Sequence, residues 1–233
     1  MHDDDPRNKT RPLPAGGPVQ RRWRLTVNGV NVTDVRHMTL SHPDFGVLAY
    51  GLTPGGYDGW TFHEVGGGGS VVLPYCAADD HVLVGLVEQS RPLQGGTVLN
   101  APRGFVDRGE LYEAAARREL LEEMGLDVAP DALQPLPGQP ANPNSAFFET
   151  ARDEGVRFFS VCLEHSMLRR DDGDSWALVP GVIRDDASGR HSRLRERIRG
   201  ARFLPWYEAA GLGDMFTNAA VARLLASLRK GAR

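Results

Sequence analysis

Residues 117–125 read RRELLEEMG, a stretch that places three glutamates within five positions and then reaches a glycine. At 3.6 residues per helical turn, Glu119, Glu122 and Glu123 fall within a sector of about 100° on one helix face. Like-charged carboxylates this close destabilise a helix unless a cation lies among them. The stretch therefore raises two connected questions, namely which cation it holds and for what chemistry.

The same helix has an apolar flank on which it can pack. Ala116, Leu120 and Met124 occupy the sector beside the glutamates, so the helix can bury one side and present its carboxylates from the other. Arg118 precedes Glu122 by four residues and can pair with it. Gly125 is suited to the left-handed backbone conformation that ends many helices.

Two interpretations of the glutamates compete. A charge run is most often a solvated helix surface, and like charges four residues apart cost only about 0.2–0.5 kcal/mol, so energetics do not exclude that interpretation. The preceding residues 101–110, APRGFVDRGE, form a glycine-containing loop whose carbonyls can turn toward the helix. A hard divalent cation such as Mg²⁺ takes oxygen ligands of this kind. We therefore expect a divalent metal site between loop and helix.

The composition is that of an ordinary globular protein, with 233 residues of which 41% are hydrophobic and 24% charged. The net charge of −3 gives no general attraction to nucleic acid or to an anionic membrane, so we expect neither partner. Cys76 and Cys162 match no metal spacing, and we interpret them as reduced, buried thiols of a cytoplasmic protein. No apolar run reaches the roughly 18 residues that a membrane helix needs.

The chain is predicted to have three parts. Residues 1–20 are polar and rich in proline, glycine and charge, which predicts a disordered tail. Residues 21–66 alternate apolar and polar side chains around an Asn–Gly pair, which predicts a hairpin in a small β-rich N-terminal unit. The glycines at 66–69 mark the boundary, and the main domain is expected at 67–233.

The main domain shows β-rich apolar runs of core-strand length on both sides of the acidic helix. A long polar segment, Arg169 to Arg197, precedes a strand that begins at Ala201, and an amphipathic helix with Ala220, Leu224 and Leu228 at four-residue spacing closes the chain. Strands alternating with only a few helices predict a mixed α/β (α+β) sandwich rather than a doubly wound sheet.

Residues 104–126, GFVDRGELYEAAARRELLEEMGL, resemble the Nudix box: G, five residues, E, seven residues, R-E, an aliphatic residue, any residue, E-E, any residue, G and an aliphatic residue. All nine fixed positions are met, by Gly104, Glu110, Arg118, Glu119, Leu120, Glu122, Glu123, Gly125 and Leu126. The resemblance implies an α/β/α sandwich with a mixed sheet. It also implies an enzyme that uses Mg²⁺ or Mn²⁺ and water to hydrolyse a nucleoside diphosphate linked to another moiety.

The resemblance also implies roles for individual residues. Glu119 and Glu123 would be the principal metal ligands, with the backbone carbonyl of Arg103 as a further ligand. Glu122 would complete the cluster or hold one of the waters of the metal, so Glu122 and Glu123 are the catalytic candidates of the box. The structural positions, which would brace loop and helix, are Gly104, Glu110, Arg118 and Gly125.

Residues before the box extend the resemblance to the ADP-ribose pyrophosphatase branch and its nucleotide-sugar relatives. The EQ-x-R pattern of that branch is matched by Glu88, Gln89 and Arg91. Arg91 could bind a diphosphate through bidentate hydrogen bonds, or it could be a surface arginine. Members of the branch commonly form homodimers through an N-terminal β-rich segment. Trp60 and Phe62 could then stack on a base, and the alternative is that both belong to the core.

The chain departs from this branch just before the box. Where the branch usually carries E-L-P-A-G, this chain has NAPRG, so Asn100 replaces a carboxylate and Arg103 replaces a small residue. Only the backbone carbonyl at 103 is needed for the metal. The departures therefore bear on the choice of ADP-ribose as substrate and not on catalysis.

The resemblance to this branch also implies one further catalytic carboxylate outside the box, in a flexible loop before the penultimate strand. We assign that loop to the Arg169–Arg197 segment. A loop of this length in a compact domain is usually functional or disordered. Glu196 is our candidate for a base or an added metal ligand, and Asp185 and Asp186 compete with it. The alternative is that Glu196 is a solvated loop residue.

Three functions stay open at this point. The first is a metal-dependent pyrophosphatase for ADP-ribose or a nucleotide sugar, with a small-molecule nucleotide as its partner. The second is a nucleotide-sensing module that binds without cleaving, and the third is an enzyme for nucleoside triphosphates, dinucleotides or RNA 5′ ends. The complete set of box carboxylates, with no visible helix-turn-helix segment, favours an enzyme over a sensor.

Overall fold

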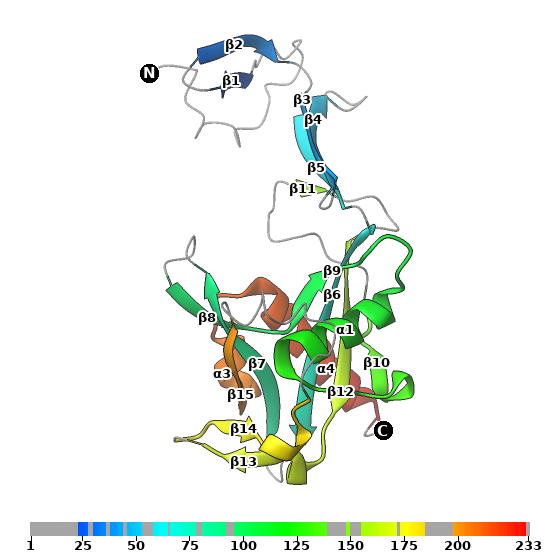
Figure 1. The fold of residues 1–233 in the computed structure, drawn as a ribbon, viewed down its shortest axis with the longest axis vertical. Coiled ribbons are helices and arrows are strands. Elements are labelled where there is room, and N and C mark those ends of the chain that lie inside the picture. The colour runs from blue at the N-terminus through cyan, green and yellow to red at the C-terminus, as the bar shows by residue number, and fades with distance from the viewer. Residues whose placement is uncertain are drawn as a thin grey trace.

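The computed structural model describes residues 23–27, 30–35, 38–43, 46–52, 58–64, 66–77, 81–91, 96–138, 148–149, 155–171, 173–184 and 198–231 (Figure 1). The predicted disordered tail, residues 1–20, lies outside these residues.

Five strands precede the main sheet, and a segment from beyond the acidic helix joins them. They are β1 (Trp23–Val27), β2 (Val30–Val35), β3 (Met38–His42), β4 (Gly46–Leu52) and β5 (Asp58–Glu64). β1 and β2 pair antiparallel, which confirms the predicted hairpin. β3, β4 and β5 form an antiparallel sheet to which β11 (Phe148–Glu149) adds in parallel. This sheet is therefore not built from residues 21–66 alone, and the predicted boundary stays a prediction.

The main sheet contains nine strands and is mixed, as predicted. Its strands are β6 (Gly68–Ala77), β7 (Val82–Arg91), β8 (Gly96–Asn100), β9 (Arg103–Phe105), β10 (Leu133–Pro135), β12 (Gly155–Cys162), β13 (Leu168–Arg170), β14 (Trp176–Leu178) and β15 (Ile198–Pro205). Their order is β10-β12-β6-β7-β15-β14-β13, with β8 paired to β7 and β9 to β6. β12 and β6 run parallel, whereas the other pairs of this sheet are antiparallel.

Helices cover both faces of this sheet (Figure 1). α1 (Tyr112–Met124) packs on one face, and α3 (Trp206–Ala210) and α4 (Met215–Gly231) pack on the other. Single-turn 3₁₀ helices lie at η3 (Pro130–Ala132), η4 (His165–Met167) and η5 (Pro180–Val182). The result is an α/β/α sandwich of the Nudix type, as expected from the sequence.

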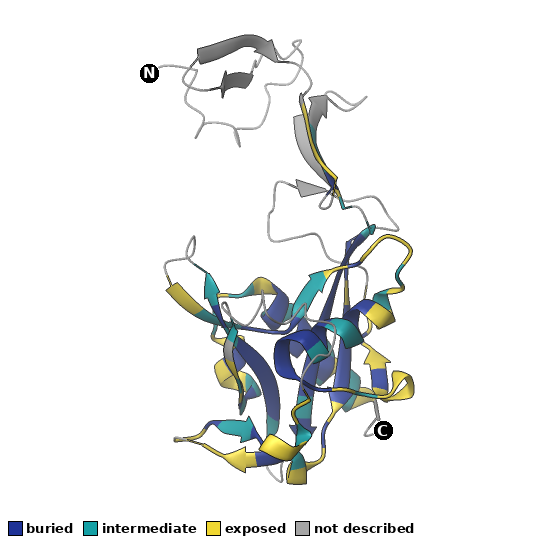
Figure 2. Ribbon diagram, in the orientation of Figure 1, coloured by how far each residue is buried: buried dark blue, intermediate teal, exposed yellow. Residues whose placement is uncertain are grey.

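Two core clusters explain why the central strands read as continuous apolar runs. In β6, Val72 belongs to the cluster that includes Leu120 of α1, whereas its neighbour Val71 belongs to the cluster that includes Leu224 of α4. Successive strand residues point to opposite faces, so a strand covered on both sides must be apolar at nearly every position. The central strands are accordingly buried along most of their length (Figure 2).

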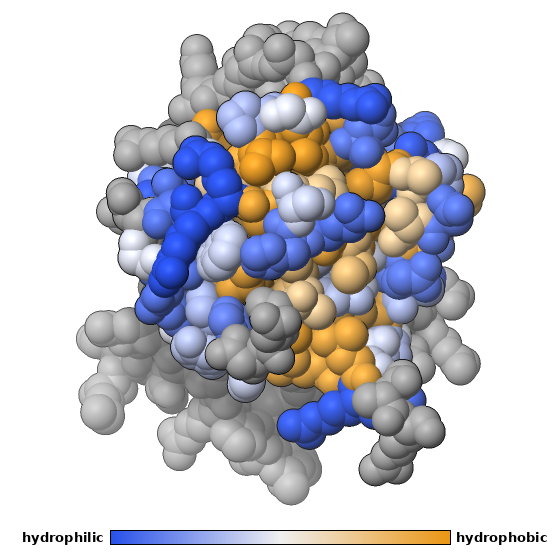
Figure 3. All heavy atoms as spheres, turned by 90° about the horizontal axis from the view of Figure 1, so that it is seen from below, coloured by the Kyte–Doolittle hydropathy of each residue, from blue (hydrophilic) through white to orange (hydrophobic). Residues whose placement is uncertain are grey.

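The C-terminal helix behaves as its spacing predicts. Ala220 and Leu224 of α4 are buried in the second cluster, and Leu228 packs against it. In the part of the chain that the structure describes, no helix is long and apolar enough to cross a membrane. On the face seen from below, hydrophilic and apolar side chains are interspersed (Figure 3).

Two expectations are corrected by the structure. The segment from Arg169 to Arg197 is not one long loop, because β14 and η5 lie within it and β13 overlaps its start. These strands are only three residues long, too short for their alternation to be recognised in the sequence. Cys76 is buried as expected, but Cys162 at the end of β12 is exposed. Both cysteines are free thiols.

Candidate active site

The three glutamates of α1 are buried, which decides between the two interpretations of the sequence. Glu119, Glu122 and Glu123 are each only 6% exposed, so this face of the helix is not a solvated surface. α1 ends where the sequence predicts, at Gly125, whose φ of 71° is left-handed. Buried carboxylates need charged or hydrogen-bonding partners, and the surroundings of the cluster supply them.

In this structure the cation among the glutamates is Arg118. Its guanidinium lies 2.5 Å from Glu119 Oε1 and 3.4 Å from Glu122 Oε2. It also donates to both carboxylate oxygens of Glu110, at 3.0 Å each, and to the backbone carbonyl of Phe105 at 2.8 Å. Arg118 thus joins the helix to the preceding loop while it compensates the charge of the cluster.

Burial makes the charged state of this cluster costly. It raises the pKa of Glu119 to about 7, against the opposing effect of Arg118, with smaller contributions from Glu122 and Glu110. Burial and the neighbouring Glu119 raise the pKa of Glu123 to about 8, although the N–H of Arg103 and the charges of Arg103 and Arg91 oppose the rise. Carboxylates held in this way favour either a proton or a metal cation.

Strand β9 brings the backbone of Arg103 to the cluster. The N–H of Arg103 donates to Glu123 Oε2 at 3.0 Å. The N–H of Val72 donates to the carbonyl of Pro102, and the N–H of Val106 donates to the carbonyl of Gly68, each at 3.0 Å. Hydrogen-bonded and non-hydrogen-bonded pairs alternate along an antiparallel ladder, so the pair of Arg103 with Val71 between β9 and β6 is a non-hydrogen-bonded one. The Arg103 carbonyl is therefore directed out of that ladder, on the same side as its N–H.

The side chain of Arg103 is engaged away from the glutamates. Its Nη1 donates to both carboxylate oxygens of Asp214, at 2.7 Å each, and its guanidinium lies 4.9 Å from the ring centroid of Phe216. The arginine that replaces a small residue in the NAPRG stretch is therefore paired with the start of α4. This pairing could not be inferred from local sequence, because Asp214 is 111 residues away.

Gly104 lies where the glutamate cluster leaves no room for a side chain. A Cβ at this position would overlap the carboxylate of Glu119.

We therefore expect Gly104→Ala to displace Glu119 from Arg118 and to destabilise the protein by about 1–3 kcal/mol. Chemical denaturation and Mn²⁺ titration measure both effects. In the control Gly181→Ala, the new Cβ meets no atom within 4 Å. Equal stability and metal affinity of the two variants would contradict this expectation.

Residues of β7 and β8 lie on the sheet face that α1 covers. Arg91, Gln89 and Val87 alternate along β7, and Val87 packs in the α1 cluster, so all three share that face. The charge of Arg91 is near enough to oppose the rise in the pKa of Glu123 that burial causes. Gln89 is 6% exposed and Asn100 only 1%, and neither side-chain carbonyl oxygen has a hydrogen-bond partner among the described residues. From the sequence, Gln89 was identified only as part of the EQ-x-R pattern.

Several predicted site residues are not placed by the structure. Glu196 and its competitors Asp185 and Asp186 lie outside the described residues. Trp60 and Phe62 are in β5, where Trp60 pairs with Phe148 of β11 along the backbone. Their side chains lie outside what the structure describes, so stacking on a base stays a prediction.

The donor set at α1 fits a hard divalent cation by its chemistry. Carboxylate and backbone carbonyl oxygens are the ligands that Mg²⁺ and Mn²⁺ prefer. In the described residues no three His, Cys, Asp or Glu side chains are arranged to hold a metal as they stand, since Arg118 lies between Glu119 and Glu122. Three buried carboxylates, two with raised pKa values, nevertheless match a site that a cation completes.

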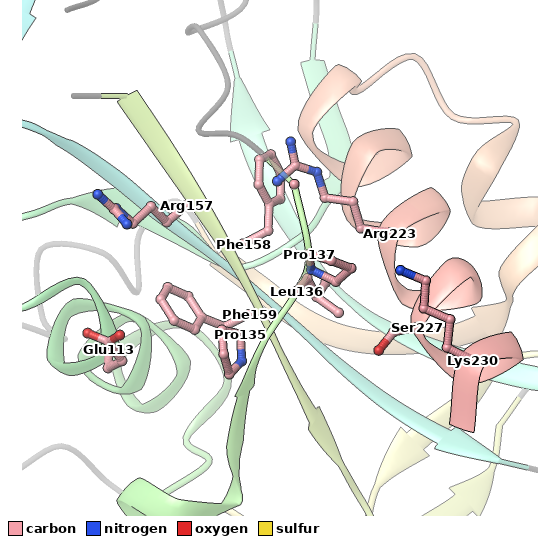
Figure 4. Close-up of a pocket in the computed structure, with 11 residues that line it drawn as sticks. Glu113, Pro135, Leu136, Pro137, Arg157, Phe158, Phe159, Arg223, Ser227 and Lys230 are labelled. Atoms are coloured by element: carbon pink, nitrogen blue, oxygen red, sulfur yellow. The ribbon is translucent and has the colours of Figure 1, made fainter. Parts of the chain in front are cut away.

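A cavity of about 460 Å³ lies apart from the glutamate face, where β10 ends between α1 and α4 (Figure 4). Arg157, Arg223 and Lys230 are among its lining residues. Two of these cations already lie on aromatic rings, Arg157 over Tyr112 at 4.5 Å and Arg223 over Phe158 at 4.3 Å. We place the chemistry at the glutamates, because the buried carboxylates gather there and not in this cavity.

Comparisons with known proteins show the family of this chain. The model of the NUDIX domain matches residues 69–207, so the chain belongs to the Nudix family. The ADP-sugar pyrophosphatase of Mus musculus is 53% identical over 45 residues, which are 19% of this chain and 21% of that protein. The match therefore spans about a fifth of the length of this relative.

Solved structures resemble the chain at lower identity. An ADP compounds hydrolase is 16% identical with a TM-score of 0.48, and the alignment covers 85% of this chain and 95% of that one. An Ap4A hydrolase of C. elegans is 16% identical with a TM-score of 0.43, over 70% of this chain and 98% of that one.

Proposed function

We propose that this protein hydrolyses the pyrophosphate bond of a nucleoside diphosphate linked to another moiety, with ADP-ribose or a nucleotide sugar as substrate and Mg²⁺ or Mn²⁺ as cofactor. The observation that carries the proposal is the burial of Glu119, Glu122 and Glu123 on one face of α1, beside the backbone of Arg103. A Nudix family member with all box carboxylates present has the donors that this reaction needs.

Each residue of the site has a distinct task in this proposal. Glu119, Glu123 and the carbonyl of Arg103 would hold the metal, and Glu122 would complete the cluster. A bound divalent ion neutralises pyrophosphate oxygens and makes a water nucleophilic near neutral pH. Arg118 and Glu110 keep helix and loop together, which fixes the carboxylates relative to the Arg103 backbone. Glu196 is proposed as the base or an added ligand.

The diphosphate-binding role falls to Arg91. A guanidinium binds two phosphate oxygens at once through charge-assisted hydrogen bonds, which orients the bridge to be cleaved. Support for this role comes from its position on the α1 face of β7 and its electrostatic effect on Glu123. Trp60 and Phe62 are proposed to stack on the base.

The substrate class rests on two observations. The 45-residue match to an ADP-sugar pyrophosphatase favours a diphosphate that links a nucleoside to a sugar. The second observation is the EQ-x-R pattern at the end of β7, whose Arg91 is near enough to act electrostatically on Glu123. We further propose that the protein forms a homodimer and acts in the cytoplasm. Light scattering of the purified protein tests the homodimer.

The substrate is tested by a screen in the presence of Mg²⁺. ADP-ribose, nucleotide sugars, dinucleotides and nucleoside triphosphates are incubated separately, and the phosphate-containing products are quantified. We expect two phosphate monoesters from ADP-ribose or a nucleotide sugar, and none when EDTA replaces Mg²⁺. Preferred cleavage of a triphosphate or dinucleotide would overturn the substrate class. Tight ADP-ribose binding without any product would support the sensing alternative.

A further inference from the structure

The segment before the box, residues 101–103, is tied to the start of α4 at both of its ends. At one end, the N–H of Ala101 donates to Thr217 Oγ1 at 2.8 Å. At the other, the Arg103 guanidinium donates to both oxygens of Asp214 at 2.7 Å. Thr217 and Asp214 are themselves joined, because the Thr217 hydroxyl donates to Asp214 Oδ2 at 2.6 Å.

Asp214 serves two purposes at once. Its carboxylate accepts a hydrogen bond at 2.8 Å from the backbone N–H of Thr217, three residues later in the chain. This is the hydrogen bond by which an N-cap residue stabilises the start of a helix, here α4. The same carboxylate receives the side chain of Arg103. The Arg103 side chain is thereby held by the start of α4, a 17-residue helix that packs on the sheet face opposite α1.

The burial of these groups makes the connection firm. Thr217 and Ala101 are fully buried, and the side chains of Arg103 and Asp214 are each only 13% exposed. Hydrogen bonds to a charged group that water cannot easily replace are stronger than those at a surface. The ring of Phe216 covers the guanidinium from one side, at 4.9 Å. Four contacts therefore restrain a three-residue segment.

The backbone of this segment meets the glutamates directly. Arg103 gives its side chain to Asp214, while its N–H donates to Glu123 and its carbonyl leaves the β6–β9 ladder on that same side. A displacement of Arg103 toward or away from α4 would therefore move both backbone groups relative to Glu123.

We propose that Asp214, supported by Thr217, is a positioning residue of the metal site: it anchors Arg103 so that its backbone stays in register with Glu123. The inference rests on the proposed function, since it takes the Arg103 carbonyl and Glu123 as metal ligands. Asp214 itself touches neither the substrate nor the metal.

The substitution Asp214→Asn separates positioning from helix capping. Asparagine caps helices about as well as aspartate, so the start of α4 is retained while the charge that holds Arg103 is lost. We expect the affinity for Mn²⁺ alone, measured by electron paramagnetic resonance titration of free Mn²⁺, to fall by about 10-fold, the lower end of the effect of removing an outer partner of a metal ligand. Hydrogen exchange at residues 101–104 should rise in the metal-free protein.

Three further variants make the result specific. Asp174→Asn makes the same chemical change in an exposed ion pair with Arg170, and it should leave the Mn²⁺ affinity unchanged. Thr217→Val removes the hydroxyl that holds Ala101 and should lower the affinity, whereas Thr217→Ser keeps a hydroxyl and should restore it. The Thr217 pair keeps the inference testable even where Asp214→Asn fails to fold.

A double-mutant cycle with Arg103→Met tests the proposed route. If Asp214 acts through Arg103, Asp214→Asn adds less than a two-fold further loss in the Arg103→Met background. Wild-type Mn²⁺ affinity in Asp214→Asn, with or without a lower melting temperature, overturns the inference. The proposed function fails separately, namely if the wild-type protein binds no Mn²⁺ or if Glu123→Gln binds it equally well.

Discussion

Glu123→Gln is expected to lower Mg²⁺-dependent turnover by about 10²- to 10³-fold, because a metal ligand supports several kcal/mol of transition-state stabilisation. The amide has nearly the shape of the carboxylate and can still accept the hydrogen bond from the Arg103 N–H. It lacks the negative charge that makes a carboxylate a stronger ligand of a divalent cation than a neutral amide. The fold should therefore persist while metal affinity and turnover fall together.

The metal-free variant should also be at least as stable as the wild type at pH 8. Burial raises the pKa of Glu123 to about 8, which shows that the ionised carboxylate is poorly accommodated without a metal. A neutral amide avoids that cost. Glu113→Gln is the matched control, because Glu113 is exposed on the same helix and should tolerate the change without loss of turnover. Full turnover of a well-folded Glu123→Gln protein would remove the proposed function.

The second large effect is a loss of stability with rising pH in the absence of metal. Burial raises the pKa of Glu119 to about 7 and that of Glu123 to about 8, from an ordinary value of 4.5. Between pH 4.5 and the raised pKa values of about 7 and about 8, the folded protein holds protons that the unfolded chain has already released. Raising the pH in this range therefore favours unfolding. The contribution is complete below about pH 4.5 and is lost as the pH passes through 7 to 8.

One pKa unit corresponds to about 1.4 kcal/mol, so the raised pKa values of the two carboxylates imply a loss of several kcal/mol across this pH range. Urea denaturation at pH 5.5, 7 and 8.5 in EDTA measures it. Mg²⁺ at 100 times its dissociation constant should restore about 2.7 kcal/mol at pH 8.5, because it binds the folded state. A free energy of unfolding in EDTA that is constant or increases across this range would contradict the expectation.

The box helix illustrates how much of the site is local in sequence. The positions of the glutamates on one face, the apolar flank with Leu120 and the end at Gly125 follow from helical periodicity and from the conformational freedom of glycine. The continuous apolar runs of β6 and β7 likewise predicted central strands. The pairing of Arg118 with Glu122 was also foreseen from their four-residue spacing.

Features that depend on partners far along the chain could not be foreseen. β11 adds to a sheet made of residues more than 80 positions earlier, and the three-residue strands β13 and β14 fall in a segment interpreted as a loop. The arginine at position 103 was interpreted as a departure that bears on the choice of substrate, yet its guanidinium pairs with Asp214. A charged side chain carries no mark in sequence of the distant group that it will meet.

The chemistry that this protein can offer is already set in its primary structure, because nine constrained positions within 23 residues determine which side chains share one helix face. How those carboxylates are held depends on the folded chain. Packing of α1 on the sheet buries them and raises their pKa values, and contacts from β9 and α4 bring the Arg103 backbone beside them. Burial and long-range pairing are properties of the assembled fold, since they depend on which distant segments exclude water from the same place.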